Sequence, residues 1–231
     1  MNIVVFTGTE IKGCTYHIKE LFVEPLRKEN SIKEFSLPKD LPHFCCGCKN
    51  CFFKGEQYCP HAEHSIPIWN AMLEADLLVF AYPVYVLRAP GQVKALLDHF
   101  ACHWLVHRPD SRMFYKRAVI LTQSIGAPNG AAQRDVKTSL IWLGVSNIKK
   151  LGFGLMEGVI WEELSEKKRQ LIKNKVQKLA AQYVEPKTVN MGFKTRVFFA
   201  LCRRIHKMTL KGEEVPSVDN QHWLDNGWLE Q

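Results

Sequence analysis

Cysteine spacing is the feature of this chain that points most directly to chemistry. Five of the eight cysteines lie in the short stretch between Cys45 and Cys59, and four of them follow the pattern C-x2-C-x2-C-x7-C. Those four are Cys45, Cys48, Cys51 and Cys59. Iron–sulfur clusters are held by thiolates in such runs, with a fourth cysteine farther along the chain, whereas zinc ribbons normally use two separated C-x2-C pairs. The spacing therefore predicts a metal centre, and a loop of metal-free thiols is the main alternative.

Further donor atoms flank this pattern. Cys46 is a spare thiol that could replace Cys45 as a ligand. His43, His61 and His64 could act as metal ligands or as a proton source, although solvent-exposed histidines are the more common case.

A set of structural disulfides is the weakest interpretation of these cysteines. The N-terminus runs directly into an apolar stretch with no charged n-region or cleavage site. The remaining thiols, Cys14, Cys102 and Cys202, are scattered singly, unlike those of small disulfide-rich scaffolds. No apolar stretch approaches the length of a membrane span. We therefore expect a reduced, cytoplasmic protein.

The net charge of +8 is concentrated in one segment. Between Pro186 and Gly212 there are seven basic residues and no acidic one. This pattern predicts a basic C-terminal segment rather than a nucleic-acid-binding body. Residues 193–207 form a candidate amphipathic helix, which could meet an anionic membrane surface or an acidic electron-transfer partner. Packing of its aromatic face on the domain or on a second subunit is the favoured interpretation.

A polar loop follows the first apolar run of the chain. Its hydroxyl, glycine and lysine residues are typical of a loop that holds a phosphate at the N-terminus of a helix, where backbone N–H groups are unpaired. The residues are Thr9, Lys12, Gly13, Cys14 and Thr15. The alternative is an ordinary polar turn in which Thr15 caps the helix.

Two more loops of unusual composition follow later apolar runs. Pro83, Val84 and Tyr85 offer a rigid backbone and apolar contact area that could lie along a flat aromatic ligand. Residues 122–126 follow the next apolar run, and they bring hydroxyl, amide and glycine groups to the end of that run.

The elements that must position these loops alternate between strand and helix. We expect strands over 3–6, 31–37, 77–81, 118–122 and 148–155, and helices over 15–29, 66–75, 91–107, 131–143 and 162–183. Such alternation predicts an α/β fold, with a five-stranded parallel sheet covered by helices on both faces. Ligands of these sheets bind outside the carboxyl ends of the strands, which is where the three loops would lie.

Together these loops resemble the flavodoxin-like NAD(P)H-dependent FMN reductases, especially the iron–sulfur flavoprotein branch. The resemblance covers about residues 1–160. It is carried by G-T-x-x-K-G-C-T at 8–15, by the C-x-G-C-x-x-C-F block that ends at Phe52, and by Tyr-Pro-Val-Tyr-x4-Pro-Gly-x2-Lys-x3-Asp at 82–98.

The resemblance implies a flavodoxin-like three-layer fold over 1–185, with a cysteine-rich loop at 43–61 and a helical C-terminal extension at 186–231. It implies an FMN whose phosphate lies on the Thr9–Thr15 loop. The residues around the flavin ring would be Pro83, Val84, Tyr85, Val86, Ser124 and Gly126. In the iron–sulfur branch the four spaced cysteines would hold a [4Fe–4S] cluster.

The implied function is an FMN-dependent oxidoreductase that takes electrons from a nicotinamide dinucleotide or a ferredoxin-type donor and works as a homo-oligomer. The alternative is a non-catalytic, flavodoxin-like module that senses redox state or metal through a zinc-binding or free-thiol loop.

Overall fold

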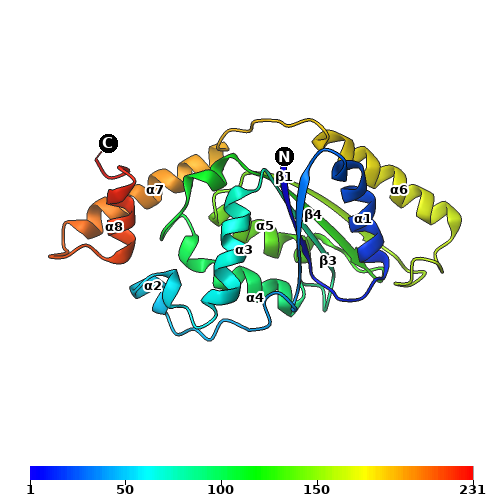
Figure 1. Ribbon diagram of the computed structural model, residues 1–231, viewed down its shortest axis with the longest axis horizontal. Helices are drawn as coiled ribbons and strands as arrows, with labels where there is room; N and C mark the ends of the chain where they lie inside the picture. Colours follow the sequence, from blue (N-terminus) through cyan, green and yellow to red (C-terminus); the bar gives the residue numbers. More distant parts are fainter. Residues whose placement is uncertain (231) are drawn as a thin grey trace.

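The computed structural model describes residues 1–230, in which the expected apolar runs form the strands of one parallel sheet (Figure 1). The strands are β1 (Asn2–Thr7), β2 (Ser31–Ser36), β3 (Leu77–Pro83), β4 (Arg117–Ser124) and β5 (Asn147–Gly154). Their order is β2-β1-β3-β4-β5, and every neighbouring pair is parallel. This is the flavodoxin-like strand order, so the expected fold is confirmed. Edge strand β2 exposes Ser31, Lys33 and Glu34 to solvent.

Helices cover both faces of the sheet and divide the core into two layers. Helices α1 (Cys14–Arg27) and α6 (Glu166–Ala180) bury their apolar stripes on one face. Helices α3 (Ala62–Glu74), α4 (Gly91–His99) and α5 (Gly130–Trp142) cover the other. The central strands β3 and β4 are buried on both sides, which is why their sequences are continuous apolar runs.

The remaining elements are short or lie after the sheet. They are α2 (Asn50–Phe53), the 3₁₀ helices η1 (Glu56–Tyr58), η2 (Ala101–His103), η3 (Ser111–Tyr115) and η4 (Ala181–Tyr183), and the C-terminal helices α7 (Phe193–Leu210) and α8 (Val218–Asp225). The chain leaves α6, crosses over the sheet, and places α7 and α8 at the opposite end of the molecule (Figure 1).

Three helices differ clearly in their bounds from the sequence-based expectation. The helix expected over 66–75 begins earlier, at Ala62. The helix expected over 91–107 ends at His99, because the following backbone turns away to bond elsewhere: Leu105 N donates to Trp142 O at 2.7 Å and Arg108 N to Cys102 O at 3.0 Å. The helix expected over 162–183 starts only at Glu166, because the preceding residues form a loop that packs over α1.

The C-terminal extension is docked through its own small core. The indole of Trp223 is fully buried, and its Nε1 donates to His107 O at 2.7 Å. Phe199 of α7 stacks on the same indole, with ring centroids 4.9 Å apart. Trp223 and Trp228 of the tail therefore pack against the rest of the domain, together with α7. Among residues 1–230, no helix is long and apolar enough to cross a membrane.

Candidate functional site

A pocket of about 330 Å³ opens at the carboxyl end of the sheet, between the loops that follow β1 and β3. Strand order reverses at this point, which is where ligands bind in open α/β sheets. Seven of the residues predicted for the flavin site line it: Thr9, Lys12, Gly13, Cys14, Thr15, Pro83 and Tyr85. The structure therefore brings the two predicted loops to one cavity.

The first loop can pass so close to its neighbours only because it begins with glycine. A Cβ on Gly8 would lie 2.5 Å from Val93 Cγ2 and 2.7 Å from Tyr82 Cβ. The Gly8 carbonyl also accepts a hydrogen bond from Gln92 Nε2 at 2.9 Å. These contacts fix where the loop turns toward α1.

The N-terminus of α1 forms one end of the pocket. Its N-cap is Gly13, which has no side chain, and Thr15 lies within the helix, so the alternative in which Thr15 caps it is not observed. The Cys14 N–H donates to Val159 O at 2.8 Å. The N–H groups of Thr15 and Tyr16 have no hydrogen-bond partner among residues 1–230. Unpaired N–H groups at a helix N-terminus are suited to a phosphate group.

Cys14 contributes backbone rather than thiol chemistry. Its side chain is buried in the core, and burial, assisted by the charge of Glu162, raises the pKa of the thiol to about 11. The thiol is therefore protonated at neutral pH and unsuited to act as a nucleophile.

Gln123 gives the pocket an unpaired polar atom. The side chain is buried at the end of β4, and its Nε2 has no hydrogen-bond partner in the described structure. A buried amide donor without a partner is costly, so this atom fits a ligand that presents an acceptor. The ring oxygens and nitrogens of a flavin are acceptors of this kind.

The loop after β3 is held in a strained turn. Tyr85 and Arg88 exchange two backbone hydrogen bonds, at 3.0 and 2.9 Å, and the residues between them have positive φ. Val86, with φ of 48°, is a β-branched residue in a region it rarely adopts. The base of the loop is fixed because Asp135 accepts from Arg88 and from Ala89 N.

Four of the predicted flavin residues do not line the pocket. Val84 packs against the core, and Val86 is 95% exposed at the tip of the turn. The Ser124 hydroxyl is buried and donates to Ala127 O at 2.5 Å. Gly126, with φ of 77°, allows the turn after β4. The last two therefore shape the loop behind Gln123.

The cysteine-rich segment, 43–61, precedes α3 and contacts the chain that follows α4 through Cys102 and Arg108. Cys45, Cys46 and Cys48 are exposed, whereas Cys51 and Cys59 are half-buried. Burial raises the pKa of the Cys59 thiol, and the charges of Cys51, Cys48 and Cys45 raise it further.

A sixth thiol and a buried arginine support this segment. Cys102, on η2, donates a hydrogen bond to the thiolate of Cys51 and lowers its pKa to about 6, with a smaller contribution from the charge of Arg108. The Arg108 guanidinium also donates to Cys51 O and, at 2.5 Å, to Asp219 Oδ1 of α8. Cys51 therefore loses its proton more readily than an ordinary thiol, and the thiolate is the form that binds metals.

Cys59, His61 and His99 form the tightest group of metal-binding side chains among residues 1–230, with donor atoms within 4.8 Å of one another. His99 Nδ1 donates to Ala95 O at 2.7 Å, so its unprotonated Nε2 accepts from His61 Nδ1 at 3.0 Å. The lone pair of this Nε2 is the one that could bind a metal. The four cysteines do not form such a group. Thiolates around one tetrahedral zinc would be about 4 Å apart, so a four-cysteine zinc site is not preformed.

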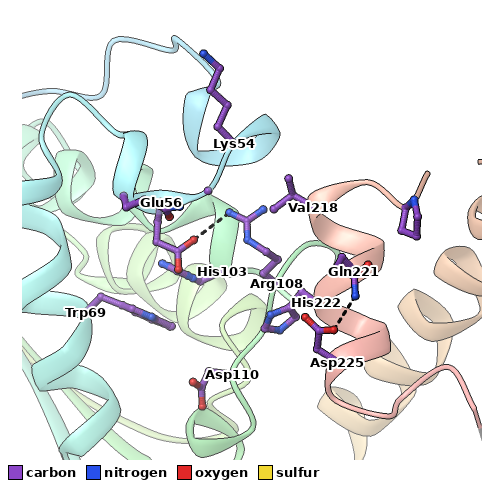
Figure 2. Close-up of a pocket in the computed structure, with 13 residues that line it drawn as sticks. Lys54, Glu56, Trp69, His103, Arg108, Asp110, Val218, Gln221, His222 and Asp225 are labelled. Atoms are coloured by element: carbon purple, nitrogen blue, oxygen red, sulfur yellow. Dashed lines mark hydrogen bonds and ion pairs between the residues drawn. The ribbon is translucent and has the colours of Figure 1, made fainter.

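A second cavity, of about 460 Å³, separates the cysteine-rich segment from α8 (Figure 2). One wall is Trp69 with His103 stacked on it at 4.0 Å. Burial lowers the pKa of His103 to about 4, so its ring is neutral at pH 7. Arg108 points into the middle of the cavity and pairs with Glu56 (Figure 2). Most of the charged side chains that line this cavity are paired or hydrogen-bonded with other residues of the protein.

Several of these residues were absent from the sequence-based prediction. Gln123 belongs to the polar loop at 122–126, but nothing in the sequence distinguishes it from Ser124 as a residue that lines the pocket. Val159 reaches the pocket only because its loop folds over α1, and Cys102 reaches Cys51 only because α4 ends early.

The comparisons with known proteins agree with this geometry. A family model described as NADPH-dependent FMN reductase matches residues 1–158. The iron-sulfur flavoprotein of Archaeoglobus fulgidus is 23% identical over 188 residues, which are 81% of this chain and 80% of that protein.

Two solved structures share the fold. An FMN-dependent NADH-azoreductase from Bacillus anthracis, in complex with FMN, has a TM-score of 0.62 at 11% identity, covering 80% of this chain and 100% of that one. An NAD(P)H:quinone oxidoreductase from Methanothermobacter marburgensis has a TM-score of 0.62 at 14% identity, covering 80% and 98%. With the family match over 1–158, we conclude that the chain belongs to the NADPH-dependent FMN reductases, a family of flavin-dependent oxidoreductases.

Proposed function

We propose that this chain binds FMN in the pocket at the β1–β3 switch point and oxidises NAD(P)H there. The unpaired N–H groups of Thr15 and Tyr16, beside the buried unpaired amide of Gln123, are the observation that carries the proposal. One end of the pocket offers donors for a phosphate, and the floor offers a donor for a ring acceptor. Both features fit FMN.

The residues of the chain divide the work between the two ends of the pocket. Thr9, Gly13 and Thr15 would hold the phosphate, with Lys12 contributing positive charge. Pro83 and Tyr85 would place the flavin ring, and the strained turn at Val86 keeps apolar area exposed beside it. When bound, the flavin supplies the redox chemistry, and the protein supplies binding, orientation and electrostatics.

We further propose that Cys45, Cys48, Cys51 and Cys59 hold a [4Fe–4S] cluster. The four thiols lie in one short segment with iron–sulfur spacing, and Cys102 and Arg108 lower the pKa of Cys51, so the donor set suits iron–sulfur ligation. The name of the Archaeoglobus relative agrees with this proposal. Such a cluster would exchange electrons with the flavin one at a time.

A nicotinamide dinucleotide is the donor that the family implies, and a ferredoxin-type donor is the other candidate. A quinone or another flat aromatic compound suits the open side of the pocket as an acceptor. We also propose a homo-oligomer, because Ile11, Tyr85 and Leu87 leave exposed apolar area beside the pocket.

Anaerobic reduction tests the catalytic part of this proposal. The FMN-loaded protein, mixed with NADPH or NADH, should lose its oxidised flavin absorbance and regain it when a quinone is added. A protein that binds FMN but is reduced by neither nucleotide would contradict the proposed donor.

A second candidate function rests on Cys59, His61 and His99. Imidazole nitrogens and a thiolate suit zinc, so these residues favour a metal-sensing role for the cysteine-rich segment. Stoichiometric zinc without iron or sulfide in an anaerobic preparation would support this function over the cluster.

A further inference from the structure

Helix α7 carries two apolar faces, and the fold uses only one of them. The inner face buries Thr195, Cys202 and His206, and His206 Nδ1 bonds to Asn220 Oδ1 at 2.7 Å. Phe198 stacks on Trp142 with ring centroids 5.0 Å apart. These contacts anchor the helix to the body, so its outer residues are not needed for docking.

The outer face nevertheless forms a continuous apolar stripe. Its residues recur every three or four positions and all are exposed, from Phe193 (83% exposed) to Met208 (65%). The stripe consists of Phe193, Val197, Leu201, Ile205 and Met208. Residues with this spacing share one side of a helix. A soluble surface rarely leaves such a row uncovered.

Basic residues border this stripe. By helical spacing, Arg204 lies on the same side of α7 as Phe193, and Lys211 directly follows the helix. Both are exposed, as are Lys194 and Arg196 in the first turn. The whole segment from Pro186 to Gly212 has seven basic residues and no acidic one. An apolar stripe bordered by cations is complementary to a surface that is apolar inside and anionic outside.

We propose that α7 binds the surface of an anionic phospholipid bilayer, lying in the plane of the headgroups with the apolar stripe toward the acyl chains. A second copy of the chain fits the stripe poorly. A two-fold contact would place this basic face against itself, and like charges would oppose each other. The charge pattern instead selects an anionic partner.

Vesicle co-sedimentation of the full-length, FMN-loaded protein tests this proposal. Binding is expected to vesicles of phosphatidylglycerol and phosphatidylcholine at low ionic strength. It should be much weaker with pure phosphatidylcholine, and should fall in about 1 M salt, where the screening length is about 3 Å. Failure to sediment with the phosphatidylglycerol vesicles at low ionic strength would overturn the proposal.

Two matched pairs of variants locate the contact. Arg204→Glu with Lys211→Glu should lower the partition coefficient by roughly 30-fold or more, because each cation near an anionic surface contributes about fivefold. Lys173→Glu with Lys175→Glu on α6 makes the same change in net charge and should retain most binding. Leu201→Asn on the stripe should weaken binding, whereas Leu171→Asn on α6 should not.

FMN content and far-ultraviolet circular dichroism confirm that each variant is folded, independently of vesicle binding. If the α6 and α7 charge variants lose vesicle binding equally, only the net charge of the protein matters, and the assignment of the contact to α7 is overturned. A concentration-dependent dimer that Leu201→Asn dissociates, without vesicle binding, would assign the stripe to a second copy. Capture of an acidic protein without vesicle binding would likewise overturn it.

Discussion

The proposed FMN pocket and the cysteine-rich segment are built in different ways. The pocket is formed by backbone at the ends of strands whose order fixes its position, with Gly8 and Gly13 allowing close approach. The cysteine-rich segment has little regular structure, and three of its thiols are exposed. The pocket is therefore preformed, whereas the segment offers reactive side chains that a bound metal would gather. The two centres should be separable by mutation.

The largest expected effect is on the metal content. Cys48→Ser removes a thiolate from the proposed four-cysteine set, so iron and sulfide should be lost almost completely while FMN is retained. Cys46→Ser alters a neighbouring exposed thiol outside the spacing and should keep the cluster. Iron, sulfide and flavin analysis of anaerobic preparations measures this difference. Loss of the cluster from Cys46→Ser would assign Cys46 as a ligand in place of Cys45, and its retention in Cys48→Ser would contradict the predicted set.

The next effect concerns the pH dependence of stability, through His103, which stacks on Trp69. The pKa of His103 is about 4 in the folded protein and near 6.5 when unfolded, so between these values only the unfolded chain binds the proton. Stability should therefore fall as pH drops from about 6.5 to 4, by up to about 3 kcal/mol from this residue.

His103→Phe keeps an aromatic ring on Trp69 but cannot titrate, so its free energy of unfolding should depend less on pH in this range. Urea unfolding at several pH values compares the two proteins. The same pH dependence in both would mean that His103 is not buried as described.

A smaller effect is expected at the phosphate end of the pocket. A Cβ on Gly13 would lie 2.7 Å from Val159 O, so Gly13→Val should displace the loop over α1 and weaken FMN binding by about tenfold to 100-fold, the loss of one charge-assisted hydrogen bond. Gly130→Val also alters the start of a helix, but its Cβ would meet open space. Fluorescence titration with FMN should show unchanged affinity for that control.

The smallest effect is expected at Gln123, and it has opposite signs in the two forms of the protein. Gln123→Leu removes a buried unpaired donor, so the FMN-free protein should be stabilised by about 1 kcal/mol while FMN affinity falls by about fivefold to tenfold. Thermal unfolding with and without FMN measures both quantities. A loss of stability without FMN would show that the amide already has a partner.

The difference between the pocket and the cysteine-rich segment also explains which features could be predicted from the sequence. Apolar periodicity and strand–helix alternation predicted the sheet, and strand ends such as Thr7–Gly8 and Tyr82–Pro83 therefore had to meet at one edge. Contacts of Val159 with α1 and of Cys102 with Cys51 depend on where irregular backbone turns. Periodicity carries no information on such turns, and it extended α4 past His99 for the same reason.

Composition of a single anaerobic preparation of the unaltered protein tests the central claim most directly. The account predicts one FMN together with about four irons and four sulfides per chain, with the flavin retained after the cluster is lost in air. A colourless protein that contains zinc and takes up no added FMN would contradict it.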